Sequence, residues 1–198
     1  MWLVAGLGNP GKTYERTRHN AGFEVADAAA ARWGAPWKRG WRVRGQWARG
    51  RTPGGEEVAL LKPSTYMNES GHAVGALARK FRLGPAQVVV VVDDVDLPLG
   101  WIRIRPRGST GGHKGLRSVA RALGSEDYLR LRVGVGPRPA GADMVKFVLG
   151  RMSGSEWKVL EAVRERAAEA LEVLVERGPD TAMGRYNGAA VTADGPAM

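Results

Sequence analysis

The feature that most constrains the fold is the uninterrupted valine run of residues 88–92, followed by two aspartates (QVVVVVDD, 87–94). β-Branched side chains favour extended backbone, and an apolar run without polar alternation predicts a strand that is buried on both faces. Such a strand needs helices on both sides of its sheet. Polar residues that follow it lie at a strand end, which is where open α/β sheets place their ligands.

Strand-like and helix-like segments alternate along the rest of the chain. Strands are predicted at 2–6, 41–51, 57–63, 101–107 and 129–136, and helices at 21–33, 68–82, from the glycine loop 108–115 to about 123, and 153–177. Asn20 is expected to cap the first helix. The interleaving predicts an α/β protein in which a central mixed twisted sheet is flanked by helices on both faces. We expect a single catalytic domain over 1–186 and a loosely ordered tail over 187–198.

Composition excludes several classes of protein. The chain has no cysteine, which excludes disulfides, thiolate metal sites and cysteine nucleophiles. The first residues lack the basic segment of a signal peptide, and no apolar run approaches the roughly 20 residues of a membrane helix. We therefore expect a cytoplasmic protein that has no membrane interaction.

The charge balance favours a polyanionic partner. The net charge is +10 and the sequence pI about 10.5, as expected of a nucleic-acid-binding protein; an arginine-rich genome is the alternative. The cations cluster, with two groups at Lys38, Arg39, Arg42, Arg44, Arg49, Arg51 and at Arg103, Arg105, Arg107, Lys114, Arg117. Positions 103 and 105 lie on one face of a predicted strand, which suits either phosphate binding or a solvated surface.

The stretch GLGNPGKT, residues 6–13, matches two nucleotide-binding patterns. As a dinucleotide fingerprint it lacks the acidic residue at the end of a second strand, because Asp27 lies within a predicted helix. As a Walker A loop it is weakened by Pro10, which has no N–H for a phosphate, and by the polar residues that follow. The valine run that ends in aspartate resembles a Walker B strand, so a P-loop ATPase stays open on these grounds alone.

A histidine provides the best candidate for catalysis. His19 precedes a predicted helix and shares the strand-end region with Asn9, Asp93 and Asp96. A histidine with a carboxylate partner is a general base that can be held in one orientation. No G-x-S-x-G nucleophile motif occurs, so water is the expected nucleophile. The histidines and acids lack metal-ligand spacing, and we expect neither a metal nor another cofactor. His72 is assigned a structural or surface role.

Five stretches together resemble bacterial peptidyl-tRNA hydrolase along nearly the whole chain. They are GLGNPGKTYERTRHNAGF (6–23), KPSTYMNESG (62–71), VVVVVDDVDLPLG (88–100), GSTGGHKGL (108–116) and LRLRVGVGPRP (129–139). The resemblance implies a cytoplasmic monomer that hydrolyses the ester between a peptide and the 3′ end of tRNA. It also implies binding of the acceptor stem and 3′ end, with no obligate protein partner.

The resemblance implies a role for each matching residue. His19 would be the general base, Asp93 would orient it, and Asn9 would lie beside the attacking water or the substrate amide. Binding roles would fall to the remaining matched positions: Tyr14, Tyr66, Met67, Asn68 and His113 at the peptide and 3′ end, and Lys114, Arg105 and Arg132 at phosphates. Arg132 as a structural strand charge is an equal alternative.

Two features depart from the family pattern. Lys114 stands where the family usually has asparagine, and we interpret it as a phosphate contact in place of a water-positioning amide. The tryptophan-rich segment 37–51 is also unusual, and packing on a sheet face is favoured over an RNA platform. Two other functions remain open: a non-catalytic RNA-binding protein with this fold, and a P-loop ATPase.

Overall fold

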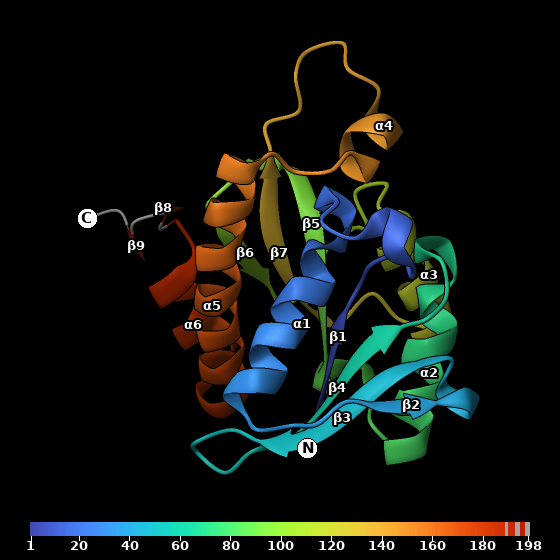
Figure 1. Cartoon of the computed structure of the whole chain (residues 1–198). Coiled ribbons are helices and arrows are strands. Elements are labelled where there is room, and N and C mark those ends of the chain that lie inside the picture. The colour runs from blue at the N-terminus through green and yellow to red at the C-terminus, as the bar shows by residue number, and fades with distance from the viewer. Residues whose placement is uncertain (189, 193–194, 197–198) are drawn as a thin grey trace.

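A seven-stranded sheet forms the centre of the structure, in the order β2-β3-β4-β1-β5-β7-β6 (Figure 1). The computed structural model describes residues 1–188, 190–192 and 195–196. The strands are β1 Trp2–Gly6, β2 Lys38–Gly40, β3 Gly45–Arg51, β4 Glu57–Pro63, β5 Val88–Pro98, β6 Ile102–Arg105 and β7 Leu129–Gly136. β4, β1, β5 and β7 are mutually parallel, and β2, β3 and β6 add antiparallel edges. The predicted mixed sheet of a single-domain α/β fold is confirmed.

The valine run is the centre of this sheet, and its side chains divide between two hydrophobic clusters. Val89 and Val91 pack with helices α1 (Ala21–Arg32) and α5 (Gly154–Arg177) on one face. Val88, Val90 and Val92 pack with α2 (Ser70–Phe81) and α3 (Lys114–Leu123) on the other. Figure 1 shows α1 and α5 side by side in front of the sheet. The prediction that this strand is buried on both faces is therefore confirmed.

Several predicted bounds agree with the structure, and others were wrong. The strands at 2–6, 57–63 and 129–136 have the predicted limits. The predicted strand 41–51 is interrupted, because Trp41–Val43 form a 3₁₀ turn and Arg44 has a left-handed backbone (φ 53°) before β3 begins. Two short helices, α4 (Met144–Leu149) and α6 (Pro179–Tyr186), were not predicted.

The tryptophans of segment 37–51 have different environments. Trp47 packs edge-on against Phe81, with 5.8 Å between ring centroids, and the Lys62 ammonium lies 4.6 Å from the ring centroid of Trp37. Trp41, in contrast, is 92% exposed. Packing on the sheet is thus a correct interpretation for two of these side chains and wrong for Trp41.

Close contact between α1 and the sheet sets the position of the residues that precede the helix. A Cβ on Gly22 would lie 2.4 Å from the Val91 carbonyl oxygen, and one on Gly6 would lie 2.1 Å from the Gly22 carbonyl oxygen. Glycine at both positions lets the first turn of α1 lie directly on β1 and β5. The 3₁₀ turn Arg18–Asn20, which leads into α1, is thereby held beside the carboxyl end of β5.

The C-terminal residues are described only in part. Val191–Thr192 and Gly195–Pro196 form a short antiparallel pair, β8 and β9. The predicted loosely ordered tail includes residues 189, 193–194 and 197–198, which lie outside the described residues. Among the described helices, none has both the length and the apolar character required to cross a membrane.

Candidate active site

A cleft of about 700 Å³ lies at the carboxyl ends of the parallel strands, where the sequence predicts a site. Its lining combines the loop after β1, the 3₁₀ turns that precede α1 and α2, the end of β5, the glycine loop before α3 with the first turn of that helix, and α4. The lining residues that the sequence had singled out are Asn9, His19, Tyr66, Met67, Asn68, Asp93, Asp96, His113, Lys114, Arg117 and Arg132. The structure therefore brings together most of the predicted site from segments far apart in the chain.

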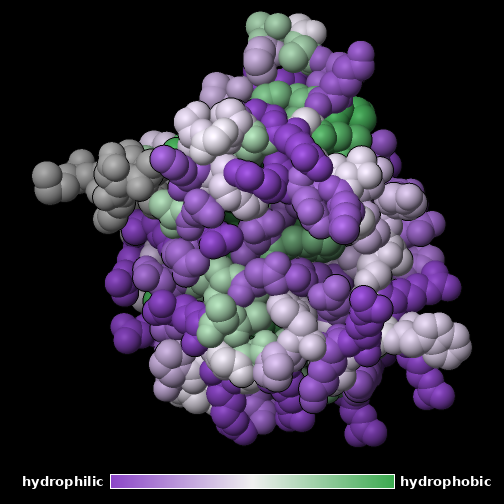
Figure 2. Space-filling model, viewed as in Figure 1, coloured by the Kyte–Doolittle hydropathy of each residue, from purple (hydrophilic) through white to green (hydrophobic). Residues whose placement is uncertain are grey.

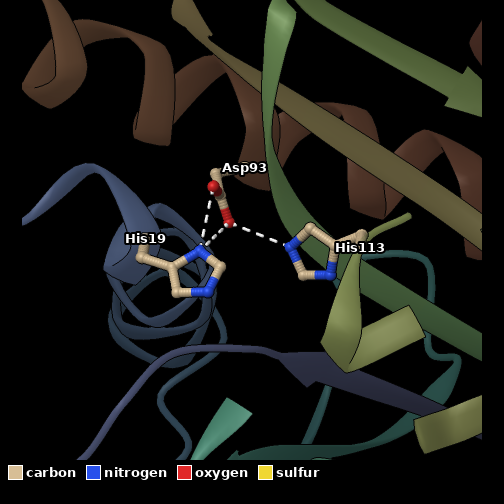
Figure 3. A group of neighbouring side chains, drawn as sticks. All are labelled: His19, Asp93 and His113. Carbon is tan, nitrogen blue, oxygen red and sulfur yellow. Dashed lines mark hydrogen bonds and ion pairs between the residues drawn. The ribbon is translucent and has the colours of Figure 1, made fainter. Parts of the chain in front are cut away.

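Asp93 is the centre of a three-residue hydrogen-bonded group (Figure 3). His19 Nδ1 lies 2.9 Å and 3.0 Å from the two carboxylate oxygens. His113 Nε2 lies 3.1 Å from Oδ1, so two imidazoles approach one carboxylate from opposite sides. The side chain of Asp93 is only 2% exposed, whereas those of His19 and His113 are 13% and 15% exposed toward the cleft.

The hydrogen-bond partners assign the tautomers of both histidines. His113 Nδ1 accepts the backbone N–H of Leu116 at 3.3 Å, as the N-cap of α3, so its proton is on Nε2 and is donated to Asp93. His19 donates from Nδ1 to the same carboxylate, which leaves the lone pair of Nε2 free. In Figure 3 this second nitrogen of His19 is turned away from Asp93. A neutral imidazole held this way is competent to accept a proton from a bound water.

The carboxyl group of Asp93 is held in its ionised form. Burial by itself raises the pKa of a carboxyl group. Here the charge interaction with His19 and the hydrogen bonds from His113 and His19 outweigh burial, and they hold the pKa of Asp93 well below its usual range. Asp93 is therefore suited to orient and stabilise an imidazolium rather than to accept the proton itself.

Asn9 is fixed in the cleft by its own hydrogen bonds. Its backbone N–H donates to Asn20 Oδ1 at 2.8 Å, and its carbonyl accepts from Asn20 Nδ2 at 3.0 Å. Asn9 Oδ1 accepts the backbone N–H of Met67 at 2.8 Å, which leaves the Nδ2 amine as the group that faces the cleft. Asn20 occupies the N-cap position of α1 as expected, but its side chain makes no capping hydrogen bond, because its amide is engaged by Asn9.

The glycine loop does not have the geometry of a phosphate-binding loop. After β1, residues Lys12–Tyr14 form a 3₁₀ turn, and the first α-helix begins only at Ala21. A Walker A lysine and threonine begin a helix whose N-terminus binds phosphate, and that helix is missing in this described segment. The loop instead turns the chain off β1 and presents Asn9 to the cleft.

Two predicted binding residues lie outside the lining of the cleft. Tyr14 contacts Tyr66 edge-to-face at 6.4 Å between centroids, which places it next to a lining residue that is itself 58% exposed. Arg105 lies on the edge strand β6 with Arg103, and both are exposed while Ile102 and Ile104 are buried. The expectation of a common face for the two arginines is confirmed.

Some contacts and lining residues of the cleft were not predicted from the sequence. Arg132 Nη1 pairs with Asp94 Oδ2 at 3.2 Å, so one cation of the cleft is partly neutralised inside the protein. Asp94 follows Asp93 in the sequence, but nothing in the sequence indicated that it would pair with Arg132.

Helix α4 adds an apolar wall to the cleft, and Figure 2 shows hydrophobic residues at the surface where α4 lies. The signal was the run MVKFVL after Asp143, which caps α4 by accepting from Lys146 N.

The three residues around Asp93 also have potential metal-ligand atoms. One such atom from each of His19, Asp93 and His113 lies within 4.8 Å of the others. Spacing along the sequence was therefore not a valid ground for expecting no metal site, because these three residues are distant in sequence and meet in the fold. The imidazole nitrogens that face Asp93 are, however, accounted for by hydrogen bonds to its carboxylate. We interpret the group as a hydrogen-bonded unit.

Comparisons with known proteins agree over nearly the whole chain. A family model described as peptidyl-tRNA hydrolase matches residues 3–194. A peptidyl-tRNA hydrolase of Gloeobacter violaceus is 46% identical over 185 residues, or 93% of this chain and 93% of that protein. One from Chloroflexus aurantiacus is 47% identical over 188 residues, or 94% of this chain and 99% of that protein.

Solved structures show the same fold. The crystal structure of peptidyl-tRNA hydrolase from Acinetobacter baumannii superposes with a TM-score of 0.87 at 32% identity, covering 94% of this chain and 96% of that one. A peptidyl-tRNA hydrolase in complex with N-propanol gives a TM-score of 0.88 at 32% identity, over 96% and 97% of the two chains.

Proposed function

The chain belongs to the peptidyl-tRNA hydrolase family and is an ester hydrolase acting on peptidyl-tRNA, and we propose that His19 is its general base, with Asp93 as the orienting carboxylate. The observation that carries this assignment is the hydrogen bond of 2.9 Å between His19 Nδ1 and Asp93 Oδ1, which leaves His19 Nε2 free in the cleft. The same arrangement orients the base in other hydrolases.

The proposed reaction has two proton transfers. His19 Nε2 takes a proton from water as the water oxygen attacks the ester carbonyl carbon, and a tetrahedral intermediate forms. When the bond to the ribose oxygen breaks, the imidazolium returns the proton to that oxygen. The products are free tRNA and an N-substituted amino acid or peptide. Asp93 remains ionised throughout and stabilises the imidazolium.

Amide donors in the cleft supply the remaining polar chemistry. Asn9 Nδ2 is the free end of an otherwise bonded amide, and Asn68 lies one 3₁₀ turn before α2 in the same lining. Donors aimed at the position of the developing oxyanion stabilise it most. We assign Asn9 to the attacking water or the carbonyl oxygen and Asn68 to substrate positioning.

The cleft also suits a peptide joined to a nucleic acid. Met67, a flexible and adaptable side chain, and the apolar wall from α4 accommodate varied peptides without selecting one side chain. Tyr14 and Tyr66 form an aromatic pair at the cleft, on which an unpaired terminal base stacks. Lys114, Arg132 and the exposed Arg105 are assigned to phosphates of the acceptor stem. We place the enzyme in the cytoplasm as a monomer.

Hydrolysis of N-acetyl-aminoacyl-tRNA tests the proposal directly. Wild-type protein should release the N-acetyl amino acid, and His19→Ala should lose hydrolysis while still binding the tRNA. Unchanged hydrolysis by His19→Ala would remove His19 from the mechanism. A wild-type protein that binds the substrate without cleaving it would instead support an RNA-binding protein with this fold. ATP turnover with neither activity would revive the ATPase interpretation.

A further inference from the structure

A second cavity, of about 380 Å³, lies outside the active-site cleft and is ringed by cations. It opens between the 3₁₀ turn at Trp41–Val43, the middle of α2 and the last turn of α3. Arg42, Arg44 and Arg79 line it together with His72, and its remaining lining residues are the small Gly71, Ala76 and Ala122. Figure 2 shows a predominantly hydrophilic surface at the lower right, where β2 and α2 lie in Figure 1.

The arginines of this cavity have no carboxylate partner among the described residues, whereas other arginines of the same hairpin do. Arg49 and Arg51 both pair with Glu57, at 3.2 Å and 2.6 Å. The segments that line the cavity, residues 42–44, 71–79 and 122, contain no Asp or Glu, and the nearest acidic residue along the chain is Glu69. Like charges held together without a counter-charge repel one another, and a bound anion relieves that repulsion.

The turn that provides two of these arginines is held in place by its neighbours. Val43 is 5% exposed and packs in the cluster that contains α2. Arg44 N donates to Trp41 O at 3.2 Å, and Arg44 O accepts from Ser64 N at 2.8 Å, which ties the turn to the end of β4. The left-handed backbone of Arg44 is thus fixed from both sides. The arginines project from a defined backbone, which lowers the entropic cost of binding a ligand.

The floor of the cavity is equally well defined. A Cβ on Gly71 would lie 2.0 Å from the Ser118 carbonyl oxygen, so α2 and α3 are in direct backbone contact. One turn further along α2 the approach is looser, since a Cβ on Gly75 would lie 3.2 Å from Arg79 Nη1 and 3.3 Å from the side chain of Ala122. The two helices therefore run in parallel, and only small side chains lie beneath the arginines.

The cavity lies close to the active site along these two helices. Asn68 of the cleft precedes His72 of the cavity by four residues, and Arg117 of the cleft precedes Ala122 by five. At 1.5 Å per residue the two sites are separated by roughly 6–8 Å along the helix axes at their nearest residues. A polyanion whose end lies in the cleft passes the cavity within a few nucleotides.

We propose that this cavity binds a backbone phosphate of the tRNA, beyond the 3′ end that occupies the cleft. The inference rests on the proposed function for the identity of the polyanion. Arginine guanidinium groups bind phosphate oxygens in a bidentate manner and remain charged, which suits three arginines around one anion. The cavity adds affinity for the body of the substrate and takes no part in the chemistry.

The test compares two double variants that each remove two positive charges. Arg42→Gln/Arg79→Gln removes two cations of the cavity, and Arg49→Gln/Arg51→Gln removes two paired cations as a matched control. Affinity for deacylated tRNA is measured at several salt concentrations. We expect the cavity variant to raise Kd roughly tenfold and to reduce the salt slope by about 1, and the control to change neither.

A short substrate separates this proposal from the proposed function. For an N-acetyl-aminoacyl ester of adenosine, which carries no phosphate, kcat/KM of the cavity variant should equal that of the wild type. For full-length N-acetyl-aminoacyl-tRNA its KM should rise while kcat is unchanged. Equal Kd shifts in the two double variants, or an unchanged Kd in the cavity variant, would overturn the phosphate site and leave an acidic protein as the alternative partner.

If the wild type cleaves neither substrate, the proposed function fails. The Kd for deacylated tRNA then still shows whether the cavity binds a phosphate. Thermal unfolding checks that both variants are folded.

Discussion

The side chain of Asn9 is oriented by the backbone of Met67, whose N–H donates to Asn9 Oδ1 at 2.8 Å. Because the oxygen is engaged, the Nδ2 amine is the only polar end of this side chain that is free for a ligand. The contact joins the glycine loop after β1 to the turn before α2. We therefore propose that Asn9 acts toward the substrate as a hydrogen-bond donor.

Replacing Asn9 by aspartate tests that role with little change in shape. Asn9→Asp keeps the acceptor for Met67 N–H and removes the donor, so we expect kcat/KM to fall by about 10²-fold, the loss typical of a donor at a developing oxyanion. Steady-state hydrolysis of N-acetyl-aminoacyl-tRNA measures the effect. Asn9→Ala, which removes both groups, should be no more active than Asn9→Asp. Near wild-type activity of Asn9→Asp would show that the donor is dispensable.

The low pKa of Asp93 determines which group controls the pH dependence. A carboxyl whose folded pKa is depressed stays ionised above its unfolded pKa of about 3.9, and it loses its charge only as pH falls through the lower folded value. Between about pH 5 and 8 Asp93 therefore does not titrate. A loss of activity at acid pH in that range therefore reports the group that takes the proton from water and not Asp93, and a flat rate profile would argue against His19 as the base.

Asp93→Asn should abolish most hydrolytic activity, because it changes which ring nitrogen of His19 carries the proton. An amide at this position offers an N–H donor in place of one oxygen, and His19 Nδ1 then accepts, which moves the proton to Nε2. We expect kcat to fall by about 10²-fold or more while tRNA binding is retained. Kinetics and tRNA binding measured together check this. Equal loss of both would indicate a damaged fold instead.

His113 has two bonds that variants can separate. It donates to Asp93 at 3.1 Å and caps α3 by accepting from Leu116 N at 3.3 Å. His113→Ala should lower kcat about tenfold through a less restrained Asp93, and should cost about 1 kcal/mol of stability through the lost cap. His113→Asn restores a capping side chain that is too short for Asp93. It should therefore recover the unfolding free energy but not the activity; recovery of both would assign His113 a purely structural role.

Lys114 is exposed at the first turn of α3 and lines the cleft, with no ion pair recorded for it among the described residues. If it contacts a tRNA phosphate, Lys114→Asn should reduce the salt slope of tRNA binding by about 1 and leave kcat unchanged. Salt-dependent binding together with single-turnover hydrolysis provides the measurement. A sharp rise in turnover would show instead that lysine replaced a useful amide.

Gly22 controls how closely α1 lies on the sheet. Gly22→Ala would place a methyl group 2.4 Å from the Val91 carbonyl oxygen and 2.5 Å from that of Leu7, and both are backbone atoms. We expect a loss of roughly 2–5 kcal/mol in unfolding free energy, measured by urea denaturation. Gly154→Ala, in the first turn of α5 with nothing within 4 Å of the added methyl, is the control and should be neutral or slightly stabilising. Similar losses for both would contradict the packing explanation.

The sequence was sufficient to predict those elements whose conformation depends on their own side chains. The valine run determined β5 and its burial on both faces, since β-branched apolar side chains admit few other environments. Pro10 and the polar residues after it correctly weakened the nucleotide-loop interpretation. The short helix α4 was missed because six residues provide too little periodicity for a prediction.

The sequence by itself determined the α/β class, the limits of three strands, and the region in which His19, Asn9 and Asp93 had to lie. Only the tertiary structure decided the roles of their individual atoms. Asp93 is shared by two imidazoles, and Asn9 presents its amide N–H₂ to the cleft. The side chain of Asn20 bonds Asn9 instead of the first turn of α1, and Arg132 pairs with Asp94. The reason is that each of these contacts joins residues from different elements, and hydrogen-bond direction depends on distances that no local pattern encodes.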